Sequence, residues 1–306
     1  MVTLTCHPET GAFTFETDEI KGVIQPNGAY HGVAQLLHKP TGVEVVHPKY
    51  SVLNLFFLFS ANLKIGVPRG WEREVSPEGN AVELRWAPND EHLGELVARY
   101  EVKEPNLVDL TVTVRSQGIY RGYELFLSSY FDPSLCPHVC LVGSPYSRAP
   151  GEPQLVRLVV NEAFEGTGLV FARDAHAARL CVDGRWDRRE RKMPTAQWCP
   201  VRYYAYPFGF QARLERGMAA VLMSRPQDCF AVISGYDTDN EDDPFKSQNP
   251  LYLSLFGRDL LPEEEYTAKV RLVVTPLDEA MSQPMAFYQA FIAEAGGEPD
   301  PGRTTK

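Results

Sequence analysis

"LVDLTVTV", residues 107–114, is the segment that decides the fold class. Branched apolar side chains occupy every second position from Val108 to Val114, and mostly polar ones stand between them. Successive side chains of a β-strand point to opposite faces, so this alternation predicts a strand with one buried and one solvated face. We expect Val108, Leu110, Val112 and Val114 to face a core.

Many other short segments rich in Val, Leu, Phe and Tyr follow the same rule, among them AVELRWAP, YELFLSSYF and LYLSLFG. Clusters of Gly, Pro, Asn and Asp separate them, as expected for strands joined by turns. The sequence therefore predicts an all-β protein, a large antiparallel β-sandwich with little helix. We expect one sandwich domain over residues 1–295 and a flexible tail over residues 296–306.

One helix is predicted near the C-terminus, where apolar residues recur at helical spacing before Gly296 and Gly297. They are Met281, Met285, Tyr288, Phe291 and Ile292. We expect this stripe to pack against the core.

Charge and patterning exclude several classes of partner. The 306 residues hold 30 Lys and Arg against 40 Asp and Glu, a formal net charge of −10, with no lysine-rich run to neutralise phosphates. No segment has the roughly 18 apolar residues of a membrane span, and the N-terminus has no signal-peptide pattern. We predict a cytoplasmic protein that binds neither nucleic acid nor membrane and needs no cofactor; the oligomeric state stays open.

The six cysteines show no CxxC spacing, which favours free thiols. Cys136, His138 and Cys140 alternate and would share one face of an extended segment, a spacing that could hold a metal. Pro137 disfavours a regular strand here, and no fourth ligand is evident. We predict no metal site.

Several segments, in order, resemble the galactose mutarotase-like β-sandwiches, the superfamily of the aldose 1-epimerases. Residues 28–46 (GAYHGVAQLLHKPTGVEVV) resemble the family's opening hairpin, and IGVPRGW at 65–71 resembles its "HG..R" segment. SSYF at 128–131 falls where the epimerases carry "H.YF", and LLPEEEYT at 260–267 resembles their "L.PGE.y". The resemblance covers most of the chain and implies a sugar site on the concave face of a sheet.

This chain departs from the family at both catalytic histidines, because the corresponding positions hold Ile65 and Ser128. Opening and closing a sugar hemiacetal needs a general acid and a general base, and a serine hydroxyl is a poor proton donor at neutral pH. We therefore expect ordinary aldose 1-epimerase activity to be absent or very weak.

Two segments hold candidates for a replacement acid and base. The acidic stretch GYDTDNEDDP, residues 235–244, includes the catalytic candidates Asp237 and Glu241, with a solvated loop or a cation site as alternatives. His31, between Gly28 and Gly32, is a third catalytic candidate, with a structural histidine as the alternative.

Substrate-binding candidates come from three segments. Arg69 could donate paired hydrogen bonds to sugar hydroxyls or a carboxylate, with a solvated arginine as the alternative. Tyr130 belongs to the SSYF segment. The aromatic stretch 197–210 contributes Arg202 and Tyr204, and alternation predicts Tyr204 and Tyr206 on one face.

Two flanking features are interpreted as structural. Trp71 is expected to fill the core under the turn at residues 68–72, with stacking on a sugar ring as the alternative. GRWDRRERK, residues 184–192, is expected to be an exposed loop with salt bridges.

Three functions remain open at the level of sequence. The first is a carbohydrate-binding or carbohydrate-active protein whose ligand is a sugar or oligosaccharide. The second is a sugar epimerase or a polysaccharide lyase with relocated acid and base residues. The third is a non-catalytic interaction protein that kept the fold and lost the site.

Overall fold

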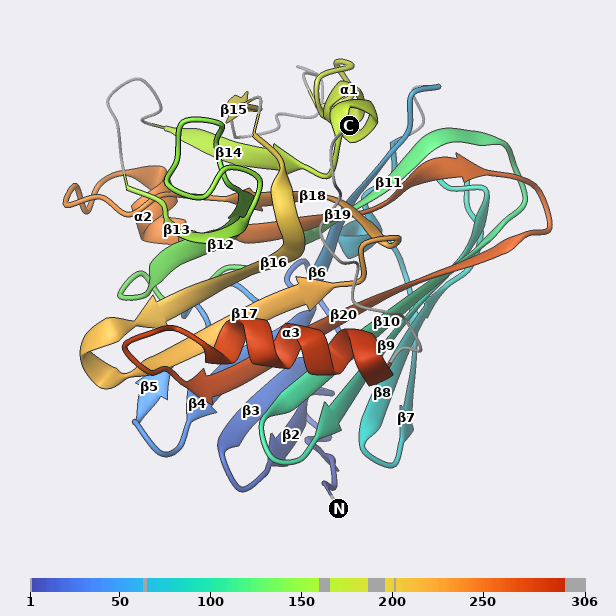
Figure 1. Ribbon diagram of the computed structural model, residues 1–306. Helices are drawn as coiled ribbons and strands as arrows, with labels where there is room; N and C mark the ends of the chain where they lie inside the picture. The colour runs from blue at the N-terminus through green and yellow to red at the C-terminus, as the bar shows by residue number, and fades with distance from the viewer. Residues whose placement is uncertain (1, 63–64, 160–165, 187–195, 201, 295–306) are drawn as a thin grey trace.

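The computed structural model describes residues 2–62, 65–159, 166–186, 196–200 and 202–294, and strands are its main secondary structure (Figure 1). They form three sheets, of nine, six and five strands. The predicted all-β antiparallel sandwich is therefore confirmed. Among the described helices, none is long and apolar enough to cross a membrane.

The nine-stranded sheet has the order β13-β12-β16-β17-β20-β10-β9-β8-β7, and every neighbouring pair is antiparallel. Its strands are β7 (Glu74–Glu78), β8 (Ala81–Trp86), β9 (Gly94–Lys103), β10 (Leu107–Ser116), β12 (Cys136–Val142), β13 (Pro153–Arg157), β16 (Tyr204–Arg213), β17 (Met218–Ser224) and β20 (Glu265–Pro276).

The six-stranded sheet has the order β15-β14-β18-β19-β11-β6, in which only the β14–β15 pair is parallel. Its strands are β6 (Asn54–Phe59), β11 (Tyr120–Ser128), β14 (Thr167–Ala172), β15 (Ala196–Trp198), β18 (Cys229–Ser234) and β19 (Leu251–Leu260). The five-stranded sheet consists of β1 (Thr5–Cys6), β2 (Phe13–Glu16), β3 (Ile20–Gln25), β4 (Gly32–His38) and β5 (Val43–Glu44), paired in chain order.

Strand β10 confirms the alternation predicted for residues 107–114. It pairs with β9 and β20, and Val108, Leu110, Val112 and Val114 are fully buried. They belong to one core that takes side chains from all three sheets. Each such burial contributes about 1.5–3 kcal/mol to folding, so this pattern fixes which face of β10 turns inward.

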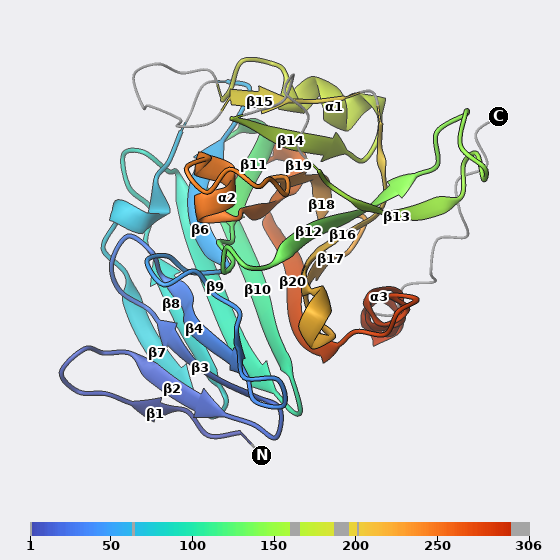
Figure 2. The ribbon, with the colours of Figure 1, turned by 90° about the vertical axis from the view of Figure 1, so that its left-hand side faces the viewer.

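The predicted C-terminal helix is α3 (Gln283–Glu294), which lies outside strands β17 and β20 (Figure 2). Its buried Tyr288, Phe291 and Ile292 pack on the outer face of the nine-stranded sheet, as expected from the stripe. The predicted tail, residues 296–306, lies outside the described residues, and the single-domain assignment stays a prediction. The other helices among the described residues are α1 (Ala175–Cys181), α2 (Pro244–Gln248) and the 3-10 turns η1 (Pro68–Gly70) and η4 (Leu214–Arg216).

Strand β12 differs from the expectation for the Cys136–Cys140 segment, because it runs through Pro137. The Pro137 carbonyl accepts a hydrogen bond from the Leu158 N–H at 3.0 Å, and a proline removes only one donor from the ladder. The His138 ring stacks on Phe210, with the ring centroids 4.6 Å apart.

Candidate functional site

The six-stranded sheet has an inner face toward the main core and an outer face with a second apolar cluster. Along β11, Leu125 and Leu127 point inward, whereas Phe126 points outward. Tyr30 lies just before β4 and Tyr50 just before β6. Both pack against the outer cluster. This outer face carries the candidate site.

Arg69 is held over this face by the turn η1. Pro68 occupies its first turn, and Trp86 Nε1 donates to the Pro68 carbonyl at 3.1 Å from beneath. Arg73 Nη2 donates to the Arg69 carbonyl at 3.0 Å. These two contacts hold the turn so that the Arg69 guanidinium carbon lies over the Phe56 ring, 4.1 Å from its centroid.

Four tyrosines gather beside Arg69. The ring centroids are 4.9 Å apart for Tyr30 and Tyr50, 4.8 Å for Tyr50 and Tyr130, and 5.5 Å for Tyr130 and Tyr252. The Arg69 guanidinium carbon is 5.9 Å from the Tyr30 ring centroid. We call Arg69, Phe56, Tyr30, Tyr50, Tyr130 and Tyr252 the Arg69–tyrosine site.

The polar groups of this site are only partly used by the protein. Tyr130 and Tyr252 hydrogen-bond to each other. Within the described chain, the hydroxyls of Tyr30 and Tyr50 and the guanidinium of Arg69 make no hydrogen bond, and Arg69 has no ion pair. Among the described residues, these donors and acceptors therefore have no protein partner.

Burial raises the pKa of Tyr130 and of Tyr252, and the phenols of Tyr30 and Tyr50 add to both increases. Both buried phenols therefore stay protonated at neutral pH. The site can donate and accept hydrogen bonds and offer aromatic faces, a combination that suits a molecule with apolar faces and hydroxyl edges.

The structure brings together two of the predicted substrate-binding residues, Arg69 and Tyr130. The other two lie elsewhere: Arg202 donates to the Val142 carbonyl at 3.4 Å and to Gln154 at 3.3 Å. The Tyr204 hydroxyl is buried and donates to the Cys229 carbonyl at 2.6 Å.

Tyr204 and Tyr206 do not share a face, so this prediction is wrong. Tyr204 belongs to the main core, whereas Tyr206 packs under α3. The register between β12 and β16 shifts between the pairs Val139–Gly209 and Leu141–Tyr204. Such an irregularity breaks the two-residue period on which the prediction rested.

His31 lies in the core behind the site, fully buried. Its Nε2 accepts a hydrogen bond from the Leu55 N–H at 3.1 Å. Burial lowers the pKa of His31 well below its usual value, and the charges of Arg73 and Arg69 lower it further. The ring is neutral, and its Nδ1 lies 3.4 Å from Asn54 Nδ2, so both ring nitrogens have polar neighbours. The catalytic role of His31 stays a prediction.

The acidic segment 235–244 divides between partnered and exposed carboxylates. Asp237 forms ion pairs with Arg157 and with Lys246, whose Nζ is 3.1 Å from Oδ1. Desolvation would raise the pKa of Asp237, but hydrogen bonds from these two cations outweigh it and the pKa is lowered. Asp243 caps α2, and Glu241 is exposed. No group of three or more His, Cys, Asp or Glu could hold a metal among the described residues.

A buried carboxylate that the sequence analysis missed, Glu124, occupies another part of the outer face. Its Oε1 accepts from Ser254 Oγ at 2.6 Å, and its Oε2 accepts from Trp186 Nε1 at 3.0 Å and Arg185 Nη1 at 3.3 Å. Arg185 and Trp186 are buried, so the expectation of an exposed loop at 184–192 is wrong for them; residues 187–192 lie outside the described chain.

The two positions matched to the epimerase histidines hold no side chain that titrates near neutral pH. Ser128 is buried and its Oγ donates to Asn54 Oδ1 at 3.4 Å, while Ile65 is buried in the outer cluster. Trp71 is half-buried against the main core, and its Nε1 donates to Glu91 at 3.2 Å. Trp71 also lines an open hollow of about 390 Å³ together with Glu72, Pro88 and Asp90.

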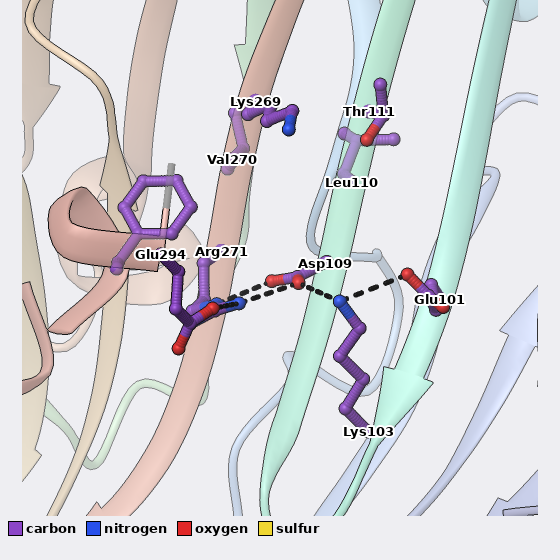
Figure 3. Close-up of a pocket in the computed structure, with 10 residues that line it drawn as sticks. Glu101, Lys103, Asp109, Leu110, Thr111, Lys269, Val270, Arg271 and Glu294 are labelled. Atoms are coloured by element: carbon purple, nitrogen blue, oxygen red, sulfur yellow. Dashed lines mark hydrogen bonds and ion pairs between the residues drawn. The ribbon is translucent and has the colours of Figure 1, made fainter. Parts of the chain in front are cut away.

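A groove of about 220 Å³ lies between α3 and strands β9, β10 and β20 (Figure 3). Arg271 contacts Asp109 and Glu294, and Lys103 contacts Asp109 and Glu101. These charges neutralise one another, which makes the groove a weaker candidate than the Arg69–tyrosine site.

The chain matches no protein-family model and no curated protein. Among solved structures, a GalM/aldose epimerase homologue from C. elegans is similar with a TM-score of 0.50 and 9% identity, over 86% of this chain and 98% of that chain. The chain has the aldose-epimerase fold. This likeness confirms the fold that the sequence resemblance implied.

Two further solved structures are less similar. A putative aldose 1-epimerase from Escherichia coli K12 has a TM-score of 0.49 and 10% identity, over 90% of this chain and 100% of that chain. A mutant of the heparan sulfate lyase HepC from Pedobacter heparinus has a TM-score of 0.46 and 6% identity, over 90% of this chain. This chain spans 37% of the lyase.

Sequence reasoning did not find Tyr30, Tyr50, Tyr252 or Phe56. Tyr30 directly precedes His31, which was singled out, but nothing in the local pattern separates a site tyrosine from a core one. Their convergence depends on strand pairing between distant segments.

Proposed function

We propose that the protein binds a carbohydrate at the Arg69–tyrosine site. The observation that carries this proposal is the clustering of the Arg69 guanidinium with the Tyr30 and Tyr50 rings, whose polar groups make no hydrogen bond within the described chain. A sugar ring supplies hydroxyls for these groups and apolar C–H faces for the aromatic rings.

The fold likeness supports this proposal by analogy only, because one fold hosts many functions. The C. elegans structure is named an aldose epimerase homologue. The proposal of a sugar ligand for the present chain rests on the residues of its own site. A role for Arg202 and Tyr204 in binding and a location in the cytoplasm stay predictions.

Catalysis remains the alternative to binding alone. An epimerase or lyase needs an acid and a base at the ligand, and His31, Asp237 and Glu241 were the candidates. None of the three donates or accepts a hydrogen bond within the Arg69–tyrosine site, among the described contacts. We therefore propose binding first, with product formation as a separate measurement.

Titration calorimetry of the purified protein with neutral and acidic mono- and oligosaccharides tests the proposal. We expect saturable binding of at least one saccharide. Tyr30→Phe and Tyr50→Phe should each weaken it about 3- to 10-fold, because a net hydrogen bond is worth about 0.5–1.5 kcal/mol.

Tyr146→Phe is the matched control, since Tyr146 is almost fully exposed and lies outside the site. It should leave the affinity unchanged. Absence of binding across the whole panel would exclude the proposed function. A saccharide affinity that neither Tyr30→Phe nor Tyr50→Phe changes would exclude the proposed site. Ultraviolet absorbance of an unsaturated product would identify a lyase.

A further inference from the structure

Arg69 is unusual among the partly buried arginines of the described chain. Arg73 and Arg202 also lack a carboxylate partner, but each donates hydrogen bonds to protein oxygens. The Arg69 guanidinium makes none, and its contacts are with the rings of Phe56, Phe57 and Tyr30. A partly buried guanidinium with five unused N–H donors lacks the acceptors that such groups normally have.

Among the described residues, the buried titratable groups beside Arg69 carry no negative charge at neutral pH. Tyr130 and Tyr252 are protonated phenols, and His31 is neutral because burial and the two arginines lower its pKa. Arg73 adds a second positive charge, and its Nη1 is buried without an acceptor. This positive field stands out in a chain with a net charge of −10.

The Arg69 guanidinium is planar and carries its five N–H donors in one plane. Its central carbon lies over the Phe56 ring, 4.1 Å from the ring centroid, and the ring supplies no acceptor for those donors. A carboxylate can accept two parallel N–H bonds from such a fork. The neighbouring Tyr30 and Tyr50 hydroxyls remain for the hydroxyl groups of the same ligand.

We propose that the ligand of the Arg69–tyrosine site is an acidic saccharide whose carboxylate binds the Arg69 guanidinium. This inference rests on the proposed function and specifies its substrate class as a uronic acid or a uronate-containing oligosaccharide. Sulfate and phosphate esters of sugars are also anionic, and the experiment separates them from the carboxylate.

The test compares matched ligands on the intact chain by calorimetry: oligogalacturonate and the neutral galactose oligomer of equal length, with a sulfated and a phosphorylated galactose as further arms. We expect the uronate to bind about 10- to 100-fold more tightly than its neutral counterpart, since hydrogen bonds to charged groups are worth about 1.5–3 kcal/mol. Its affinity should fall as sodium chloride is added.

Arg69→Gln should weaken binding of the uronate more than binding of the neutral oligomer, and so remove this preference. Arg69→Lys keeps the positive charge but lacks the planar guanidinium, so it should retain part of the preference for the uronate. This second variant keeps the test valid if Arg69→Gln fails to fold. Arg148→Gln is the matched control, because Arg148 is exposed and has no carboxylate partner among the described residues.

Each failure has a distinct outcome. Equal affinity for the uronate and the neutral oligomer, or a preference that survives Arg69→Gln, overturns the inference while the proposed function stands. Tighter binding of the sulfated or phosphorylated sugar overturns the assignment to a carboxylate. Absence of binding by every saccharide removes the proposed function itself.

Discussion

Arg185 and Glu124 form a buried ion pair on the outer face of the six-stranded sheet. Nη1 of Arg185 is 3.3 Å from Oε2 of Glu124, and their side chains are 1% and 0% exposed. Trp186 donates to the same carboxylate oxygen and packs against Phe126, which in turn contacts Tyr252 of the Arg69–tyrosine site. One end of this face is therefore filled by the chain itself, and the other end presents unused polar groups.

Arg185→Met should destabilise the protein strongly. The change removes the cation and leaves Glu124 buried without its charge partner, which typically costs about 3–5 kcal/mol. Urea unfolding followed by circular dichroism measures the loss. The double variant with Glu124→Gln should recover part of it, because no uncompensated carboxylate remains. A loss below about 1 kcal/mol in the single variant would contradict the prediction.

The stability of Glu124→Gln relative to wild type should rise with pH. Burial raises the pKa of Glu124 above 4.5, although Arg185 lowers it. The folded state thus binds this proton more tightly than the unfolded state. The stabilisation of the folded wild-type protein by this proton is fully present below the pKa of Glu124 in the unfolded state. It is lost as the pH rises through the pKa of Glu124 in the folded state. The Glu124→Gln variant has no proton to lose at this position, so its stability does not change in this way.

Urea unfolding of wild type and Glu124→Gln between about pH 4 and pH 8 tests this dependence. Parallel stability curves across that interval would show that Glu124 has the same pKa in both states.

Arg271→Gln should loosen helix α3. The Arg271 guanidinium makes two hydrogen bonds to Asp109 on β10, at 2.7 and 2.9 Å, and two to Glu294 on α3, at 3.0 and 2.7 Å. Removing this buried cation should cost about 3–5 kcal/mol. In the Arg271→Gln variant, hydrogen exchange should accelerate more at the α3 amides than at the β10 amides.

Lys269→Gln is the control for Arg271→Gln. Lys269 lines the same groove (Figure 3), but its exposed side chain makes no hydrogen bond or ion pair in the described part of the chain. If both variants change α3 exchange equally, the Arg271 contacts are not what holds the helix.

Cys199 should be the most reactive thiol. A hydrogen bond with Cys181, the last residue of α1, lowers the pKa of Cys199 to about 7 from 9.0, although burial opposes the shift. Iodoacetamide labelling followed by mass spectrometry should give a rate midpoint near that pH, and Cys181→Ala should shift the midpoint upward. Cys6→Ser, at an exposed position, should leave it unchanged. A wild-type midpoint near 9 would refute the prediction.

The protein should not accelerate the mutarotation of glucose or galactose. Ser128 and Ile65 replace the two family histidines, and general acid–base assistance is typically worth roughly 100- to 10,000-fold in rate. Polarimetry of freshly dissolved α-glucose and α-galactose measures this directly. If equilibration accelerates in proportion to protein concentration, the prediction is wrong, and His31→Ala and Glu241→Ala would then show which residue took over.

Local patterns predicted those features that depend on neighbours in the chain. The alternation around Val112 identified β10, and the stripe around Tyr288 identified α3, because each period reports a single buried face. Tyr206 was misplaced because a register shift interrupts the period of β16, and Arg185 was misplaced because charge alone does not reveal a buried partner.

The sequence by itself determined the class of fold, through alternating apolar residues that must be buried on one side, and it identified Arg69 and Tyr130 as candidates. Only the tertiary structure decided that these two lie beside Tyr30 and Tyr252. The four residues come from segments that lie far apart in the sequence. Pairing between strands from such distant segments sets the distances between the four side chains. Whether an arginine is left without an acceptor is likewise a property of the packed molecule, because every possible partner must first be placed.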